Sequence, residues 1–262
     1  MMVGDSAVGS TVGGYRIISL IARGGMGSVY LAEDARLDRR VALKIPAPEL
    51  VGDAAFRDRF LRETKLAASL EHQAIVPVFD AGEDEGRLYL ALRYVEGTDL
   101  AGLIRDGGPL PPAQLIHLLS QIASALDAAH AHGLVHRDVK PGNILVGAGD
   151  QAYLSDFGLT KRRGSESGLT RTGQFIGTLD YVAPEMIEGH ELTGAADQYS
   201  LACVALEALT GEPPFRRDTD AATLYAHLHD APPEPPFEAS RDPRERGRGA
   251  PSGDGKATNR SL

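Results

Sequence analysis

The hydrophobic pattern of the chain changes near Gly97, and this change limits the folds that it can adopt. Before Gly97, short runs of β-branched and aromatic residues alternate with clusters of Gly, Asp and Arg, which is typical of strands. These runs are 15–22, 28–33, 41–46, 76–81 and 88–94. After Gly97, apolar residues recur at steps of three and four, which is typical of helices. The sequence therefore predicts an α+β fold in which a strand-rich part precedes a mainly helical part.

Three helices are predicted from this spacing. The segment 53–70 interrupts the strands, and Glu63 lies on its apolar stripe, so we expect a carboxylate on the inward face. That stripe consists of Phe56, Phe60, Ala67 and Leu70. A second helix follows Pro111 and Pro112. The third, 195–209, is apolar nearly all round, which predicts a helix that runs through a core.

Composition and charge exclude several classes of protein. The chain has 262 residues, of which 42% are hydrophobic and 24% charged, so a fibrous or wholly disordered chain is excluded. The net charge of -9 argues against a dedicated nucleic-acid binder and against adhesion to anionic lipid. Residues 1–14 lack a signal-peptide pattern, and nowhere do about 18 uncharged apolar residues follow one another. We expect a cytoplasmic protein without a membrane segment in this chain, whose partners are proteins or small molecules.

The last residues differ in composition from the rest. The segment 240–262 contains no Val, Ile, Phe, Met, Tyr or Trp and carries six basic and three acidic residues. Such a segment cannot bury enough apolar surface to fold alone. We therefore predict a disordered basic tail over 239–262, after a strand-rich unit over 13–94 and a helical unit over 95–238.

A glycine-rich segment lies between two strand patterns. Gly24, Gly25 and Gly27 lack side chains that would keep backbone amides away from phosphate oxygens. An ordinary glycine hairpin turn explains the segment equally well. A dinucleotide-binding fingerprint is disfavoured, because a strand follows these glycines where that motif requires a helix.

Lys44 is expected to face the same space as Ala42, because side chains alternate along the strand 41–46. A half-buried ammonium needs an anion, and Glu63 on its apolar stripe needs a cation, so we propose that Lys44 and Glu63 pair. The alternative is that Lys44 extends to solvent.

Five polar residues gather in 136–143, directly after an apolar helix: His136, Arg137, Asp138, Lys140 and Asn143. A short strand, 144–146, follows, and Asp156 ends the next apolar segment. We expect the two carboxylates and the amide to converge on one cleft. This set suits magnesium chemistry, with Asn143 and Asp156 as ligands and Asp138 available to take a proton.

These motifs, in this order, resemble those of the eukaryotic-like (Hanks-type) serine/threonine protein kinases of bacteria, over about residues 13–229. The resemblance rests on the glycine segment, Lys44, Glu63, the segment 136–143, Asp156-Phe157-Gly158, Ala183-Pro184-Glu185 and Asp197. It implies a two-lobed fold: an N-terminal antiparallel sheet with one helix, and a mainly helical C-terminal lobe that looks shortened at its end.

The resemblance also implies roles for single residues. Lys44 would hold the α- and β-phosphates of ATP with Glu63 behind it, and Asn143 and Asp156 would hold two Mg²⁺. Asp138 would accept the proton of the substrate hydroxyl, and Lys140 would contact the transferred phosphate. The remaining implied ATP-binding residues are Ala22, Gly24, Gly25, Gly27, Val29, Ala42, Leu92, Tyr94, Val95 and Leu145.

Regulation and acceptor binding are expected in the segment between Asp156 and Glu185. Lys140 and Thr178 resemble those of Ser/Thr rather than Tyr kinases, and Thr178 is expected to help dock the substrate. We predict autophosphorylation of Thr170 and Thr172, with Arg137 binding the added phosphate. Autophosphorylation between the two subunits of a homodimer would fit this prediction.

Two departures from the family pattern leave alternatives open. Ala22 replaces the first glycine of the loop, which would weaken ATP binding if the backbone there needs a glycine-like conformation. The shortened end makes Arg246 the candidate partner of Glu185, which is otherwise expected to be left as a buried, unpaired charge. A truncated pseudokinase or scaffold is therefore the alternative function. A small-molecule phosphotransferase is a third possibility.

The histidines, His130 among them, show no metal-ligand spacing in the sequence, and we expect no carboxylate partner for them.

Overall fold

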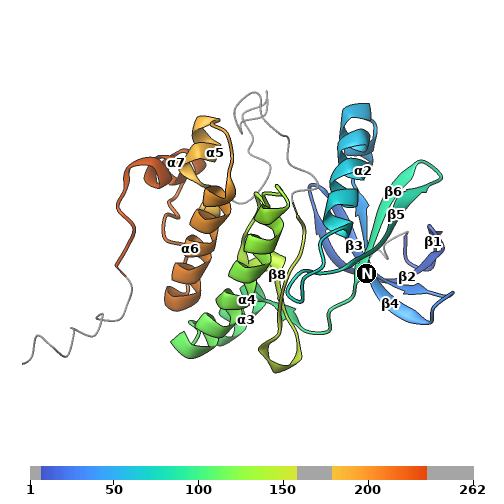
Figure 1. Cartoon of the computed structure of the whole chain (residues 1–262), viewed down its shortest axis with the longest axis horizontal. Coiled ribbons are helices and arrows are strands. Elements are labelled where there is room, and N and C mark those ends of the chain that lie inside the picture. The colour runs from blue at the N-terminus through green and yellow to red at the C-terminus, as the bar shows by residue number, and fades with distance from the viewer. Residues whose placement is uncertain (1–6, 158–178, 235–262) are drawn as a thin grey trace, which may run out of the picture.

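The computed structural model describes residues 7–157 and 179–234. It has a sheet lobe, formed by β1–β6 with α1 and α2, and a helical lobe, formed by α3–α7 with β7–β9 (Figure 1). The α+β fold predicted from the change near Gly97 is confirmed. The predictions for Thr170, Thr172, Thr178, Arg246 and the tail 239–262 lie outside the described residues.

The sheet lobe contains a six-stranded antiparallel sheet in the order β1-β2-β3-β4-β6-β5. Its strands are β1 (Thr11–Val12), β2 (Tyr15–Gly24), β3 (Gly27–Asp34), β4 (Arg39–Pro46), β5 (Val78–Asp84) and β6 (Arg87–Arg93). Four of the predicted runs coincide closely with β2, β3, β4 and β6, and the fifth overlaps β5. Alternation along β4 buries Val41 and Leu43 on one face and places Lys44 on the other, as predicted.

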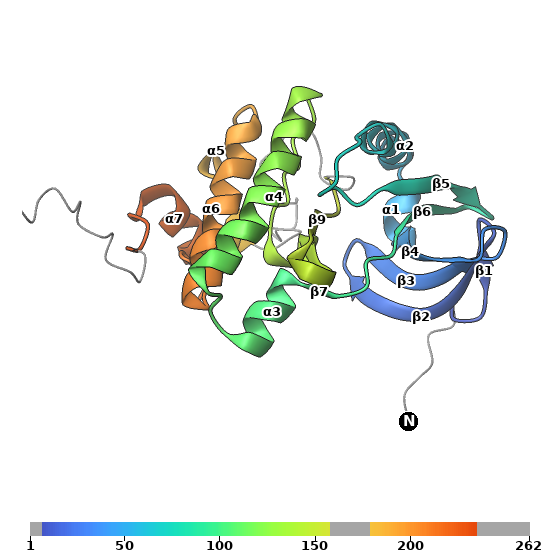
Figure 2. The ribbon, with the colours of Figure 1, turned by 60° about the horizontal axis from the view of Figure 1, so that its bottom comes forward.

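One face of this sheet is covered by α2 (Ala54–Ala68), which follows the short α1 (Pro48–Val51). Figure 2 shows α2 beside β5. The predicted stripe is buried: Phe56 and Phe60 pack with Val76, Leu88 and Leu90 in one apolar cluster. Glu63 is 9% exposed, so the predicted inward-facing carboxylate is confirmed.

The helical lobe is built around α4 (Pro112–Ala131) and α6 (Gly194–Thr210), which contact each other (Figure 2). The other helices are α3 (Leu100–Gly107), α5 (Pro184–Glu188) and α7 (Asp220–His229). Both predicted helices are present, and α6 carries buried residues on several sides. Cys203 in α6 is buried, and burial raises its thiol pKa to about 12.

A small three-stranded antiparallel sheet and two 3₁₀ turns lie where the helical lobe faces the sheet lobe. The strands are β7 (Thr98–Asp99), β8 (Ile144–Val146) and β9 (Ala152–Leu154), and the turns are η1 (Pro141–Asn143) and η2 (Ala148–Asp150). Leu154 N donates to Ala74 O at 2.8 Å, and Val76 N donates to Leu154 O at 3.0 Å. These bonds tie β9 to the chain that leads into β5, so Asp156 is held against the sheet lobe.

Two other features bear on the sequence predictions. Glu185 in α5 is only partly buried, so the expectation of a fully buried charge was wrong. Within the described ranges, no helix combines the length and apolar character that a membrane span requires.

Candidate active site

A buried carboxylate shapes the segment 136–138. Asp197, in the first turn of α6, has no exposed surface and accepts hydrogen bonds from His136 N and Arg137 N, both at 2.7 Å. His130 Nε2 lies 2.8 Å from the same carboxylate. Arg137 has a φ of 66°, a conformation that is costly for a residue with a side chain. The two hydrogen bonds to Asp197 hold the backbone in this conformation.

His136 joins this segment to the strand before Asp156. Its Nδ1 accepts from Asp138 N at 3.2 Å, so its Nε2 carries the proton and donates to Ser155 O at 2.8 Å. The imidazole is fully buried and packs against Phe157, with ring centroids 4.7 Å apart. Burial lowers the pKa of His136, which keeps the ring neutral and able to make both bonds.

Asp138 is held by two neighbouring side chains. Lys140 Nζ lies 2.8 Å from Asp138 Oδ2, and Asn143 Nδ2 donates to the same oxygen at 3.0 Å. Asn143 Nδ2 also donates to Asp138 O at 2.7 Å. Asp138, Lys140 and Asn143 are thus one hydrogen-bonded group.

The second acidic residue connects this group to the sheet lobe. Asn143 O accepts from Ser155 N at 2.9 Å, which places Asp156 next to the group. Asp156 Oδ1 lies 2.9 Å from Lys44 Nζ, and the Lys44 side chain is 12% exposed. Lys44 therefore does not extend to solvent. Lys44 of β4, Asp156 after β9 and Asn143 of η1 are thus linked across the two lobes by this ion pair and the backbone bond from Ser155 to Asn143.

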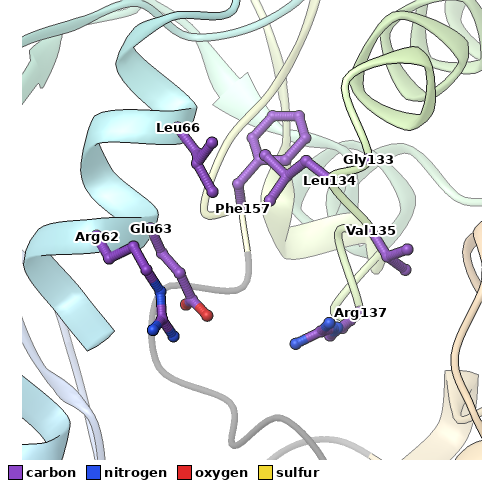
Figure 3. Close-up of a pocket in the computed structure, with 8 residues that line it drawn as sticks. All are labelled: Arg62, Glu63, Leu66, Gly133, Leu134, Val135, Arg137 and Phe157. Carbon is purple, nitrogen blue, oxygen red and sulfur yellow. The ribbon is translucent and has the colours of Figure 1, made fainter. Parts of the chain in front are cut away.

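The expected ion pair between Lys44 and Glu63 is not formed. Among the ion pairs of the described residues, Lys44 is joined to Asp156 instead. Figure 3 shows Glu63 and Arg62 projecting from α2 into a small pocket, with Arg137 on the opposite wall and Phe157 between the two sides. Asp156, which follows β9, reaches Lys44. Glu63 projects instead from α2 into this pocket. The role of Glu63 in supporting Lys44 stays a prediction.

The glycine-rich segment forms the turn between β2 and β3. Gly27 has a φ of 139°, and a Cβ there would lie 2.2 Å from Ile45 O, so a glycine is required by the close approach to β4. Gly24 and Gly25 have no other heavy atom within 4 Å of an ideal Cβ position. The segment is a hairpin turn, and the open backbone at Gly24 and Gly25 is compatible with phosphate binding, which stays a prediction.

The backbone at Ala22 does not need a glycine. Within the described ranges, the non-glycine residues with positive φ are Asp38, Glu85, Arg137, Asp150 and Asp156. Ala22 lies in β2 opposite Val29, directly after a shift in the strand register between Leu20 and Ala22. The weakening of ATP binding considered from the sequence has no basis in backbone strain.

Four of the predicted ATP-binding residues belong to one apolar cluster that draws on both lobes: Ala42, Leu92, Val95 and Leu145. Ala42 pairs with Leu92 across β4 and β6. Val29 is half-buried opposite Lys44, and Tyr94 is half-buried beside Val95. Ala22 is exposed in β2. The structure thus brings the lining residues into the neighbourhood of the Lys44–Asp156 pair.

The donor set fits magnesium rather than zinc. Asp156 offers carboxylate oxygens, and the two hydrogen bonds from the Asn143 side chain to Asp138 use its nitrogen, which leaves the amide oxygen for a metal. No group of three or more His, Cys, Asp or Glu side chains in the described part of the chain could enclose a metal ion. Mg²⁺ commonly binds through one or two protein oxygens and completes its shell with water and substrate phosphates.

The contact between His130 and Asp197 was not predicted from the sequence. His130 was expected to have no carboxylate nearby, and the structure corrects this expectation, because His130 contacts Asp197. The two residues are 67 positions apart in the chain, so local spacing contains no signal for the contact. Asp197 itself was noted only through the family resemblance.

Comparisons with known proteins agree with this geometry. The protein kinase domain family matches residues 15–243. The chain is 50% identical over 228 residues to serine/threonine-protein kinase PknD of Mycobacterium tuberculosis (strain ATCC 25618 / H37Rv), covering 87% of this chain and 34% of that protein. It is 46% identical over 231 residues to PknE of the same strain, covering 88% of this chain and 40% of that protein.

The fold agrees as well. The crystal structure of the M. tuberculosis PknI kinase domain aligns with a TM-score of 0.69 and 33% identity, covering 92% of this chain and 86% of that chain. The two-lobed kinase-like fold is therefore confirmed. The chain spans 34% of the length of PknD and 40% of that of PknE. On these similarities, the chain belongs to the bacterial Hanks-type serine/threonine protein kinases.

Proposed function

We propose that this protein transfers the γ-phosphoryl group of Mg-ATP to serine and threonine hydroxyls of proteins. The observation that carries the proposal is the joining of the Lys44–Asp156 pair to the Asp138–Lys140–Asn143 group through the Ser155–Asn143 bond. Phosphoryl transfer needs positioning and charge neutralisation more than covalent chemistry. These residues supply both.

The sheet lobe would bind the nucleotide. The Lys44 ammonium would shift partly away from Asp156 and bind the α- and β-phosphates, because these groups together carry more negative charge than a single carboxylate. The open backbone at Gly24 and Gly25 would approach the phosphates, and the cluster around Ala42 and Leu92 would cover the adenine. Mg²⁺, held by Asp156 and Asn143, would neutralise charge on the phosphate oxygens.

The helical lobe would activate the acceptor. Asp138 would take the proton that the hydroxyl loses as its oxygen bonds to the γ-phosphorus, while the bond from that phosphorus to the β–γ bridging oxygen breaks and ADP leaves. Lys140 would bind the transferred phosphoryl group. Lys140 and Asn143 hold the Asp138 carboxylate in one orientation, and His136 fixes its backbone. Oriented groups of this kind lower the entropic cost of reaching the transition state.

Regulation by autophosphorylation is part of the proposal. Thr170 and Thr172 would accept phosphate, Arg137 would bind it, and Thr178 would help dock the acceptor. Arg137 lies next to Asp138, so a phosphate bound to it would restrain the residues that carry the chemistry. Mass spectrometry after incubation with Mg-ATP tests this part, which fails if neither threonine carries phosphate. The homodimer and the cytoplasmic location stay predictions.

The transfer reaction is tested with labelled ATP, Mg²⁺ and a generic protein substrate. We compare the wild type with Asp138→Asn and Lys44→Met, and use Asp127→Asn and Lys65→Met, at exposed helix positions, as matched controls. Loss of the general base should slow transfer by about 10²- to 10⁴-fold, with both controls near the wild-type rate. Equal label incorporation by all five proteins would indicate a contaminating kinase and favour the scaffold alternative.

A further inference from the structure

The turn η3 (Leu179–Tyr181) comes directly after Thr178 and is anchored to α6 through Tyr181. Ser200 Oγ donates to Tyr181 O at 2.7 Å, and Tyr181 Oη donates to Glu207 Oε2 at 2.5 Å. Burial raises the pKa of both Tyr181 and Glu207, so the tyrosine stays protonated and able to donate. Both anchors act on the last residue of the turn.

Asp180 is held from a different direction. Its side chain is 12% exposed, and Arg216 Nη2 lies 2.5 Å from its Oδ2. The Arg216 side chain is 60% exposed, so the guanidinium reaches the turn from the surface. The hydrogen bond to Asp180 raises the pKa of Arg216, so the guanidinium stays charged at any physiological pH.

The backbone that presents Arg216 is fixed on both sides. Phe215 is 4% exposed, and its ring centroid lies 4.8 Å from that of the buried His227 in α7. On the other side, Arg217 N donates to the buried Thr223 Oγ1 at 3.1 Å. The guanidinium of Arg216 therefore extends from a rigid base, and truncating it leaves these backbone contacts in place.

We propose that Arg216 is a positioning residue for the acceptor protein: through Asp180 it fixes the η3 turn next to Thr178. This inference rests on the proposed function, which assigns acceptor docking to Thr178. The anchors on Tyr181 hold the last residue of the turn to α6, and Arg216 holds Asp180, the middle residue. Asp180 is one residue nearer in sequence to Thr178 than Tyr181 is.

Removing the guanidinium leaves a nearly buried carboxylate without its counter-charge, and such a group moves toward water. The turn would then shift at Asp180. A displacement of about 1 Å can reduce reaction rates by about 10²-fold when it misplaces a reactant. Nucleotide binding should not change, because Lys44, Asn143 and Asp156 are held by contacts that do not involve Arg216.

The test measures KM separately for a protein acceptor and for ATP. Arg217→Ala is the matched control, because Arg217 is the adjacent arginine and pairs with the half-exposed Asp230 at 2.7 Å. We expect Arg216→Ala to raise the acceptor KM by about 10-fold with an unchanged KM for ATP, within the range that misplacement allows. Arg216→Lys should recover most of the loss, and Arg217→Ala should match the wild type.

Two results would overturn the inference. One is an acceptor KM for Arg216→Ala that equals that of Arg217→Ala. The other is an equal rise in both KM values, which indicates a general structural defect.

A second measurement does not depend on activity. Hydrogen exchange of the backbone amides of 179–182 should be faster in Arg216→Ala than in Arg217→Ala, with α6 unchanged in both. Equal exchange at 179–182 in the two variants would refute the positioning role. If the wild type transfers no phosphate, the proposed function fails, and this exchange experiment still decides whether Arg216 holds the turn.

Discussion

Replacing Asp197 tests how the structure holds the catalytic segment. In Asp197→Ala, the buried His136 N and the neighbouring Arg137 N lose the acceptor that they share, and His130 loses its partner. A buried donor left without a partner costs about 1–3 kcal/mol, so the two amides together cost about 2–6 kcal/mol. This is a large share of a typical unfolding free energy of about 5–15 kcal/mol. The backbone at Arg137 would also relax from its φ of 66°.

Urea unfolding and phosphoryl-transfer kinetics check this prediction together. The matched control is His130→Gln, which removes one partner of the same carboxylate and should cost about 0.5–1.5 kcal/mol. In Asp197→Ala, relaxation at Arg137 displaces Asp138, so we expect kcat/KM to fall by about 10²-fold. An unfolding free energy within about 1 kcal/mol of the wild type, or an unchanged kcat/KM, would refute this account of Asp197.

Two further predictions concern the glycine turn and pH. Gly27→Ala should destabilise the protein by about 1–3 kcal/mol, because its Cβ would collide with Ile45 O, whereas Gly24→Ala should have little effect on the thermal unfolding midpoint. Equal midpoints for the two variants would contradict this. Burial lowers the pKa of His136 and His227, so the unfolded chain binds more protons and stability falls as pH drops below about 6.5. The slope should reach about 1.4 kcal/mol per pH unit for each proton and be smaller in His227→Gln; a slope unaffected by that change would contradict the assignment.

Much of the fold was predictable because hydrophobic periodicity acts locally. Period-two alternation identified β4 and placed Lys44 on the face opposite Val41 and Leu43. Helical spacing identified α2 and the inward direction of Glu63, which is buried as expected. The nearness of Asp138 and Asn143 was predictable because they lie within six positions of each other, whereas the ion pair of Lys140 with Asp138 was not predicted.

Contacts between distant segments could not be predicted in this way. The partner of Lys44 depends on how β9 and α2 are placed against β4, and the sequence pattern does not distinguish Glu63 from Asp156. Asp180 and Arg216 are 36 positions apart and belong to no shared motif. Their pairing follows from the packing of α6, α7 and η3, which only the structure shows.

The most direct test of the active-site assignment is the affinity for ADP with and without Mg²⁺, measured by titration calorimetry. If Lys44, Asn143 and Asp156 serve one nucleotide, Mg²⁺ strengthens ADP binding to the wild type and to an Asp230→Asn control at the surface. Losing one charged ligand costs about 1.5–3 kcal/mol, so Asp156→Asn should weaken Mg-dependent binding by about 10- to 150-fold. Metal-free ADP binding should not weaken, because Lys44 then no longer shares its charge with Asp156. An Asp156→Asn protein that keeps the full effect of Mg²⁺ would contradict the assignment.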